Sequence, residues 1–117
     1  MESILTSIKK LLGVHAEDES FDTDIIMHIN STFSTLNQLG VGPAEGFMIM
    51  DEDATWEDFI QDKRTIESVK SYMYCKVRLL FDPSSLTSSV IAAYERQITE
   101  FEWRLNVAVD PEPTQTS

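Results

Sequence analysis

The sequence lacks the features that disulfide-stabilised, membrane-spanning and exported proteins require. It has one cysteine in 117 residues and therefore cannot form an internal disulfide. No apolar run approaches the roughly 18 residues of a membrane-spanning helix, and residues 1–5 have neither the basic start nor the long apolar run of a secretory signal. We therefore expect a cytosolic protein that uses no membrane, with Cys75 as a buried and unreactive thiol.

Positive charge is also scarce. Nine Lys and Arg residues stand against 20 Asp and Glu residues, which gives a formal net charge of −11. A protein that follows the nucleic-acid backbone needs a basic surface to displace counterions, so this composition argues against DNA binding. The same charge leaves open that DNA passes close to the protein without adhering to it.

The residues that carry catalysis or bind metals are few. The two histidines, His15 and His28, lie thirteen positions apart, and we expect the first in a solvated loop and the second at a helix boundary. There is no glycine-rich phosphate loop and no Cys/His ligand spacing. Residues 51–62 fail as a calcium loop, because Trp56 stands where glycine is needed and Asp62 where glutamate is needed. We expect no enzyme, no cofactor and no metal.

What the sequence does contain is helical periodicity, in four segments: residues 3–12, 22–39, 62–82 and 87–106. In the third segment, which we expect to be the central helix, apolar residues recur at steps of three and four on one face, and further apolar residues widen that face. We expect Asp62 or Thr65 to cap its start and Pro83 to end it. The repeating face comprises Ile66, Val69, Met73, Val77 and Leu80, and the widening residues are Tyr72, Cys75 and Leu79.

The other three segments each have one apolar stripe. In the first, Lys9 and Lys10 are expected on the far side from the stripe, and Gly13 is expected to end the helix. Asp22 is expected to open the second by capping it. The last has a narrow coiled-coil-like seam, an i, i+4 pair between Glu100 and Arg104, and a partly buried Trp103. The seam comprises Ile91, Tyr94, Ile98, Phe101 and Leu105.

Two stretches lack a helical pattern. Residues 44–61 contain the short apolar run 47–50, which is either a strand or a loop, followed by an acidic turn. Trp56 is expected to pin this segment to the bundle, together with Phe59 and Ile60. Residues 107–117 are rich in proline and small polar residues and are expected to be a flexible tail. The predicted fold is a mostly all-α, four-helix domain at residues 1–106, with a long, partly extended loop between its second and third helices.

The charges are unevenly distributed along the chain. Residues 45–58 carry six acidic side chains and no basic one, whereas residues 63–78 carry five basic side chains and one acidic. These two surfaces predict head-to-tail association between copies, although both are equally consistent with solvated faces. The residues proposed for this subunit interface are Asp51, Glu52, Asp53, Glu57, Asp58, Lys63, Arg64, Lys70 and Lys76.

Five segments in this order and spacing resemble the head–tail connector (adaptor) proteins of tailed bacteriophages, especially those of phages and prophages of Gram-positive bacteria. Each segment is unspecific alone, but the resemblance extends over nearly the whole chain, to about Pro111. The segments are residues 4–13, 21–26, 37–42, 76–83 and 102–107.

The resemblance implies a small helical, non-catalytic virion protein at the head–tail interface, assembled in the host cytoplasm. Such proteins form a ring under the portal after DNA packaging, extend the DNA channel and join the head to a head-completion (stopper) or tail protein. An acidic lining would repel the DNA backbone and let it slide. A tail that becomes ordered on docking to the portal would comprise Trp103, Val107, Val109, Asp110 and Pro111.

Two other functions are compatible with the composition. One is a small acidic regulatory or adaptor domain that binds a single protein partner through residues 44–61. The other is an acidic mimic of DNA that blocks a nucleic-acid-binding protein. A regulator predicts a stable monomer or dimer, and a mimic predicts salt-sensitive binding to a basic protein, whereas a connector predicts many copies assembled on a portal.

Overall fold

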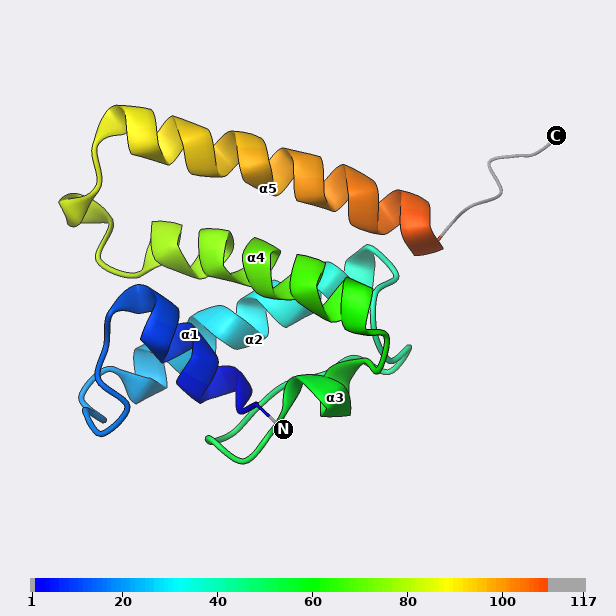
Figure 1. Ribbon diagram of the computed structural model, residues 1–117, viewed down its shortest axis with the longest axis horizontal. Coiled ribbons are helices and arrows are strands. Elements are labelled where there is room, and N and C mark those ends of the chain that lie inside the picture. Colours follow the sequence, from blue (N-terminus) through cyan, green and yellow to red (C-terminus); the bar gives the residue numbers. More distant parts are fainter. Residues whose placement is uncertain (1, 110–117) are drawn as a thin grey trace, which may run out of the picture.

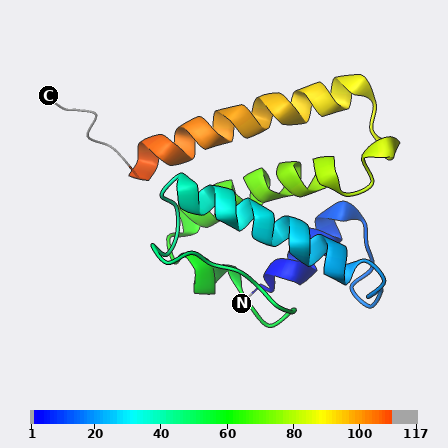
Figure 2. The ribbon, with the colours of Figure 1, turned by 180° about the vertical axis from the view of Figure 1, so that it is seen from behind.

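The helix predicted to be central in the sequence is also central in space. In the computed structural model, which describes residues 2–109, helix α4 (Lys63–Leu80) packs against α1, α2 and α5 (Figure 1). Helices α1 and α2 lie on one side of α4, and α5 lies on the other side (Figures 1 and 2). The predicted apolar face explains this position, because most of its residues are buried, whereas Leu80 in the last turn is exposed.

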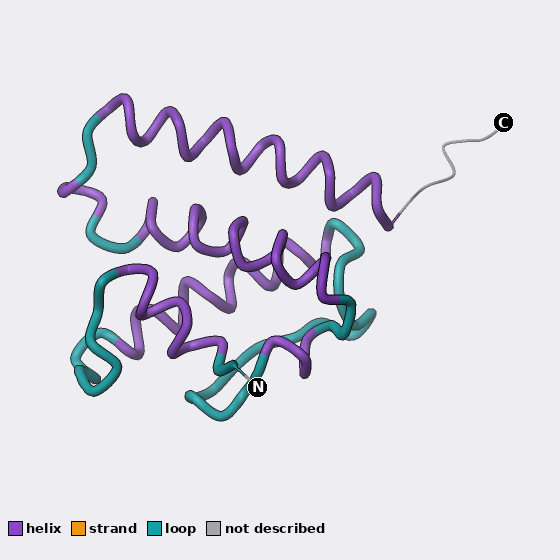
Figure 3. The backbone as a smooth tube through the Cα atoms, in the orientation of Figure 1, coloured by secondary structure: helices purple, strands orange, loops and turns teal. Residues whose placement is uncertain are grey.

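The remaining elements are α1 (Ile4–Leu12), α2 (Asp22–Gln38), α3 (Trp56–Phe59), a 3-10 turn (Pro83–Ser85) and α5 (Ser88–Val109). The mostly all-α fold is confirmed, and the four long helices lie where periodicity placed them. Figure 3 shows helices and loops, with no strand in the described part of the chain. The single-turn α3 was not predicted, because four residues are too few for a periodic signal.

Local hydrogen bonds set the helix ends. The Ser3 hydroxyl accepts a hydrogen bond from the backbone N–H of Thr6 at 3.2 Å, and Gly13 ends α1 in a left-handed conformation at φ 80°. The predicted cap at Asp22 is wrong, since Phe21 holds the cap position of α2 and offers no side-chain acceptor. Asp62 does occupy the cap position of α4, but its carboxylate accepts from the Thr65 hydroxyl at 2.6 Å, which lowers the pKa of Asp62.

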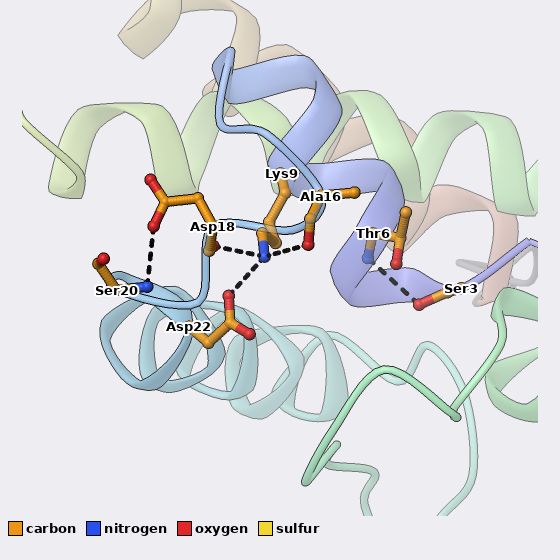
Figure 4. Close-up of polar contacts among 7 residues, drawn as sticks. All are labelled: Ser3, Thr6, Lys9, Ala16, Asp18, Ser20 and Asp22. Atoms are coloured by element: carbon orange, nitrogen blue, oxygen red, sulfur yellow. Dashed lines mark hydrogen bonds and ion pairs between the residues drawn. The ribbon is translucent and has the colours of Figure 1, made fainter.

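Lys9 departs most from the sequence analysis, because it is 2% exposed rather than on the outer side of α1. Its ammonium donates to the carbonyl oxygens of Ala16, at 3.0 Å, and Asp18, at 2.8 Å. It also lies 2.7 Å from Oδ1 of Asp22, at the start of α2 (Figure 4). The periodic pattern predicts an exposed Lys9, because it contains no information on a loop that folds back over this side chain and supplies its hydrogen-bond partners.

One hydrophobic core joins all the long helices to residues 41–59. Its large buried side chains come from α1, α2, α4 and the connection before α4. Trp56 is 1% exposed, and its indole N–H donates to the Ser7 hydroxyl at 2.9 Å, so α3 is tied to α1. Phe59 is also buried, which confirms that Trp56 and Phe59 pin the connection to the bundle. The buried apolar residues comprise Ile4, Leu5, Ile8, Ile25, Ile29, Phe33, Leu36, Val41, Ile49, Trp56, Phe59, Ile66, Val69, Tyr72, Met73, Val77 and Leu105.

The apolar run 47–50 is a loop clamped by a side chain, which resolves the choice between strand and loop. The amide of Asn30 donates to the carbonyl oxygen of Ile49 at 2.9 Å and accepts from its N–H at 2.7 Å. Both polar groups of Ile49 are thus satisfied without a neighbouring strand. Ile49 is buried while Met48 and Met50 on either side are exposed, so alternate side chains point in opposite directions.

Helix α5 extends further than predicted. It continues to Val109, so residues 107–109 are helical instead of belonging to a tail. The rest of the predicted tail, residues 110–117, lies outside the described residues. Of the predicted seam, Leu105 is buried and the other members are half-buried, because α5 packs mainly on α4. The tyrosine hydroxyl of Tyr72 reinforces this contact by donating to the carboxylate of Glu102 at 2.7 Å.

Two glycines with positive φ provide a matched test of this packing. A Cβ at Gly42, at φ 92°, would overlap the ring of Phe59, whereas a Cβ at Gly13, at φ 80°, would meet no atom. Gly13→Ala is expected to lower the free energy of unfolding by about 1 kcal/mol, the usual strain of a left-handed residue. Gly42→Ala adds overpacking and is expected to cost roughly 2–5 kcal/mol in urea denaturation. Equal losses would contradict the close approach to Phe59.

Candidate functional site

The described residues contain no arrangement suited to catalysis. Among residues 2–109, no three His, Cys, Asp or Glu side chains come close enough to hold a metal ion. His15 is exposed beside Glu17, at 3.5 Å between Nδ1 and Oε1, and Cys75 is buried. Burial raises the pKa of the Cys75 thiol, which keeps it protonated and unreactive.

The acidic segment presents its carboxylates on a well-defined loop. Asp51, Glu52, Asp53 and Asp58 are exposed, and Glu57 is half-buried. Oδ1 of Asp51 accepts from the N–H of Asp53 at 2.9 Å, which closes a local turn. The Thr55 hydroxyl accepts a hydrogen bond from the backbone N–H of Asp58, and the Asp58 carboxylate accepts one from the N–H of Thr55. These two bonds cap the start of α3. The loop thus holds a cluster of negative charge at one edge of the molecule.

The basic residues of α4 do not form a matching basic surface. Lys70 lies 2.8 Å from Glu2 and 3.7 Å from Glu67, and the hydrogen bond to Glu2 raises the pKa of Lys70. The Lys76 ammonium lies 5.9 Å from the centroid of the Tyr72 ring. These two cations therefore already have partners within the chain itself.

Two basic residues at the start of α4 remain at the surface. Lys63 and Arg64 are both exposed. Lys63 lines a shallow hollow that it shares with Glu2, Glu57 and Lys70. The structure therefore brings part of the acidic segment and part of the basic helix together inside one chain, and their charges offset each other there.

Exposed apolar side chains mark two further surfaces. Trp103 is 68% exposed, more than predicted, and Val107 lies one helical turn further along α5 and is also exposed. Met48 and Met50 are 63% and 78% exposed on the loop before α3. The sequence analysis did not single out the two methionines, although their alternation around Ile49 was a signal that an extended segment would expose them.

The fold is a small helical bundle with charged and apolar side chains exposed at its surface. A family model described as phage connector protein matches residues 4–112, and the chain belongs to this family. The resemblance inferred from the sequence is thereby confirmed, and the family is a structural one. No curated protein and no solved structure matches the chain. No helix within residues 2–109 has the length and apolar character needed to cross a membrane.

Proposed function

We propose that this protein is a head–tail connector that assembles as a ring under the phage portal. In that position it extends the DNA channel and joins the filled head to the next head-completion or tail protein in the virion. The observation that carries the proposal is the family match over residues 4–112, which covers the whole described bundle. The net charge of −11 supports a channel component, because acidic walls repel the DNA backbone.

We assign portal docking to the chain that follows α5. Val109 is the last residue of that helix, which extends beyond the end of α4 (Figure 1). Asp110 and Pro111, also predicted to dock, follow directly but lie outside the described residues. Trp103 and Val107, the other residues predicted to dock, lie earlier on α5 and are exposed.

The acidic segment is assigned to contacts between subunits. Its exposed carboxylates, Asp51, Glu52 and Asp53, have no ion pair within residues 2–109, and that of Asp51 accepts a hydrogen bond from the N–H of Asp53. Lys63 and Arg64 are the members of the predicted basic surface that remain exposed for a neighbour. A charged contact of this kind is expected to weaken as salt is raised.

The proposal is tested by light scattering across protein concentration, with and without purified portal from the same phage. A large oligomer, or many copies recruited by the portal, is the expected result. A chain ending at Val109 should keep its circular dichroism spectrum and lose portal binding. A protein that stays monomeric and ignores the portal would contradict the proposed function.

One observation favours a second candidate, a small adaptor domain that binds a single partner through residues 44–61. The clamped loop displays Met48 and Met50 beside three carboxylates, which suits a compact docking motif. This candidate predicts a monomer or dimer of constant mass at every concentration, so the same light-scattering series separates the two.

A further inference from the structure

Two different edges of the molecule carry exposed apolar residues next to charged ones. The α5 edge comprises Arg96, Trp103 and Val107, together with Glu100, whose charge is paired with Arg104, and the loop edge comprises Met48, Met50, Asp51, Glu52 and Asp53. We propose that the α5 edge of one copy docks on the loop edge of the next, with Trp103 as the central anchor. This inference rests on the proposed function, since it names the surfaces through which neighbouring subunits meet.

The α5 edge faces away from the rest of the bundle. Arg96, Trp103 and Val107 are separated by seven and four residues, so they share one side of the helix. Leu105, which is buried against the core, lies on the opposite side. Arg104 is engaged with Glu100 at 3.2 Å, whereas Arg96 has no ion pair in the described part of the chain. The edge therefore offers an exposed indole and an available cation.

The loop edge is held in place before any contact forms. The two hydrogen bonds between Asn30 and Ile49 fix the backbone between Met48 and Met50. Phe47 packs against Phe33 at 5.0 Å between ring centroids, which anchors the same segment from inside. A surface that is ordered in advance loses little conformational entropy on binding. Methionine side chains adapt to an aromatic ring and make favourable sulfur–aromatic contacts.

The positions of the two edges suit repeated association. Helix α5 runs along one long edge of the molecule, and the loop before α3 runs along the opposite edge, with α4 and the α1–α2 pair between them (Figures 1 and 2). A contact between two different surfaces leaves each copy with one free surface of each kind. Further copies therefore add in the same way, and a suitable rotation closes the series into a ring.

The chemistry of the two edges is complementary. Tryptophan and arginine are the residues that most often dominate binding energy at protein interfaces. Arg96 would approach the carboxylates of residues 51–53, while Trp103 would be covered by the two methionines. On the predicted basic face of α4, Lys63 and Arg64 are exposed, whereas Lys70 pairs with Glu2 and Lys76 lies 5.9 Å from the centroid of the Tyr72 ring.

Disulfide cross-linking with and without portal tests this geometry. The double variant Met50→Cys/Trp103→Cys, used at a protein concentration high enough to offset the loss of the Trp103 anchor, should give a ladder of covalent oligomers under mild oxidation. A mixture of the two single variants should stop at the dimer, because each chain then has one reactive edge. Cys75 is buried and should not compete. The control Lys10→Cys/Trp103→Cys moves one thiol to an exposed position on α1 and should give no ladder.

Side-chain exchange provides a second readout. Trp103→Ala should raise the protein concentration at half-assembly about tenfold, the effect expected when a central anchor is lost. Arg96→Glu should also weaken assembly, and adding Glu52→Arg to it should restore part of the loss. Lys10→Glu, at an exposed position on α1, should leave assembly unchanged. Circular dichroism should show that all these variants keep the fold, since each changed side chain is exposed.

The outcomes separate this inference from the proposed function. Oligomers or portal complexes that form without the Met50–Trp103 ladder, and that tolerate Trp103→Ala, would overturn the assignment of the edges and leave the connector role intact. A chain that remains monomeric both alone and with portal would overturn both. A ladder specific to the Met50 and Trp103 pair would establish the contact.

Discussion

Replacing Lys9 with alanine is expected to lower the free energy of unfolding by about 3–5 kcal/mol, the range seen when one partner of a buried ion pair is removed. The change leaves the carboxylate of Asp22 without its cation, 2.7 Å away in the native protein. It also deprives the carbonyl oxygens of Ala16 and Asp18 of a donor. A natural domain has only about 5–15 kcal/mol of stability, so this variant should unfold at a much lower urea concentration.

Lys10 supplies the matched control. It is the next residue on α1, has the same side chain and is exposed, so Lys10→Ala should change the free energy of unfolding by less than about 0.5 kcal/mol. Lys9→Met tests the cause, because it keeps most of the apolar stem but not the charge and should still be destabilising. If Lys9→Ala and Lys10→Ala had equal effects, the buried network around Lys9 would not contribute to stability.

Replacing Trp56 with alanine is expected to cost about 3–5 kcal/mol, as is usual when a fully buried aromatic residue is truncated. The side chain is 1% exposed and joins α3 to α1 through its bond to Ser7. Its loss would open a cavity and also leave the Ser7 hydroxyl without one of its partners. Trp56→Phe should cost less, because a phenyl ring still fills part of the space of the indole, although the hydrogen bond to Ser7 is lost.

The second tryptophan is the control for the first. Trp103→Ala removes the same side chain from an exposed helix position, so the stability of the isolated subunit should change by no more than about 0.5 kcal/mol. Urea denaturation followed by circular dichroism measures both variants without relying on tryptophan fluorescence. A large loss of stability for Trp103→Ala would show that α5 is packed differently and would also weaken its assignment to an intermolecular contact.

The sequence by itself determined the helices and the family. Apolar spacing located four long helices, because a helix buries one face at intervals of three and four residues and this pattern is local. Gly13 and Pro83 marked helix ends through backbone preferences that need no tertiary partner. The family resemblance, confirmed over residues 4–112, came from the order and spacing of several segments.

Short and irregular elements depended on contacts between distant residues. Residues 47–50 were ambiguous because the group that satisfies the backbone of Ile49 is Asn30, nineteen positions earlier. Helix α3 was missed because a single turn is held by its cap and by the burial of Trp56, not by periodicity. The prolines at positions 111 and 113 favour an end of α5 at residue 106, but a proline restricts mainly the residue directly before it, and the helix continues to Val109.

Tertiary structure alone decided which charges and apolar groups are available to a partner. The sequence pattern predicts that Lys9 is exposed, but the following loop covers it and supplies two carbonyl acceptors. The pattern also predicts free cations on α4, but Lys70 pairs with Glu2 and Lys76 lies over the ring of Tyr72. Trp103 and Met50 became surface features because α5 packs mainly on α4 and Ile49 points inward. Charge and hydrophobicity belong to single residues, but their exposure depends on everything packed around them.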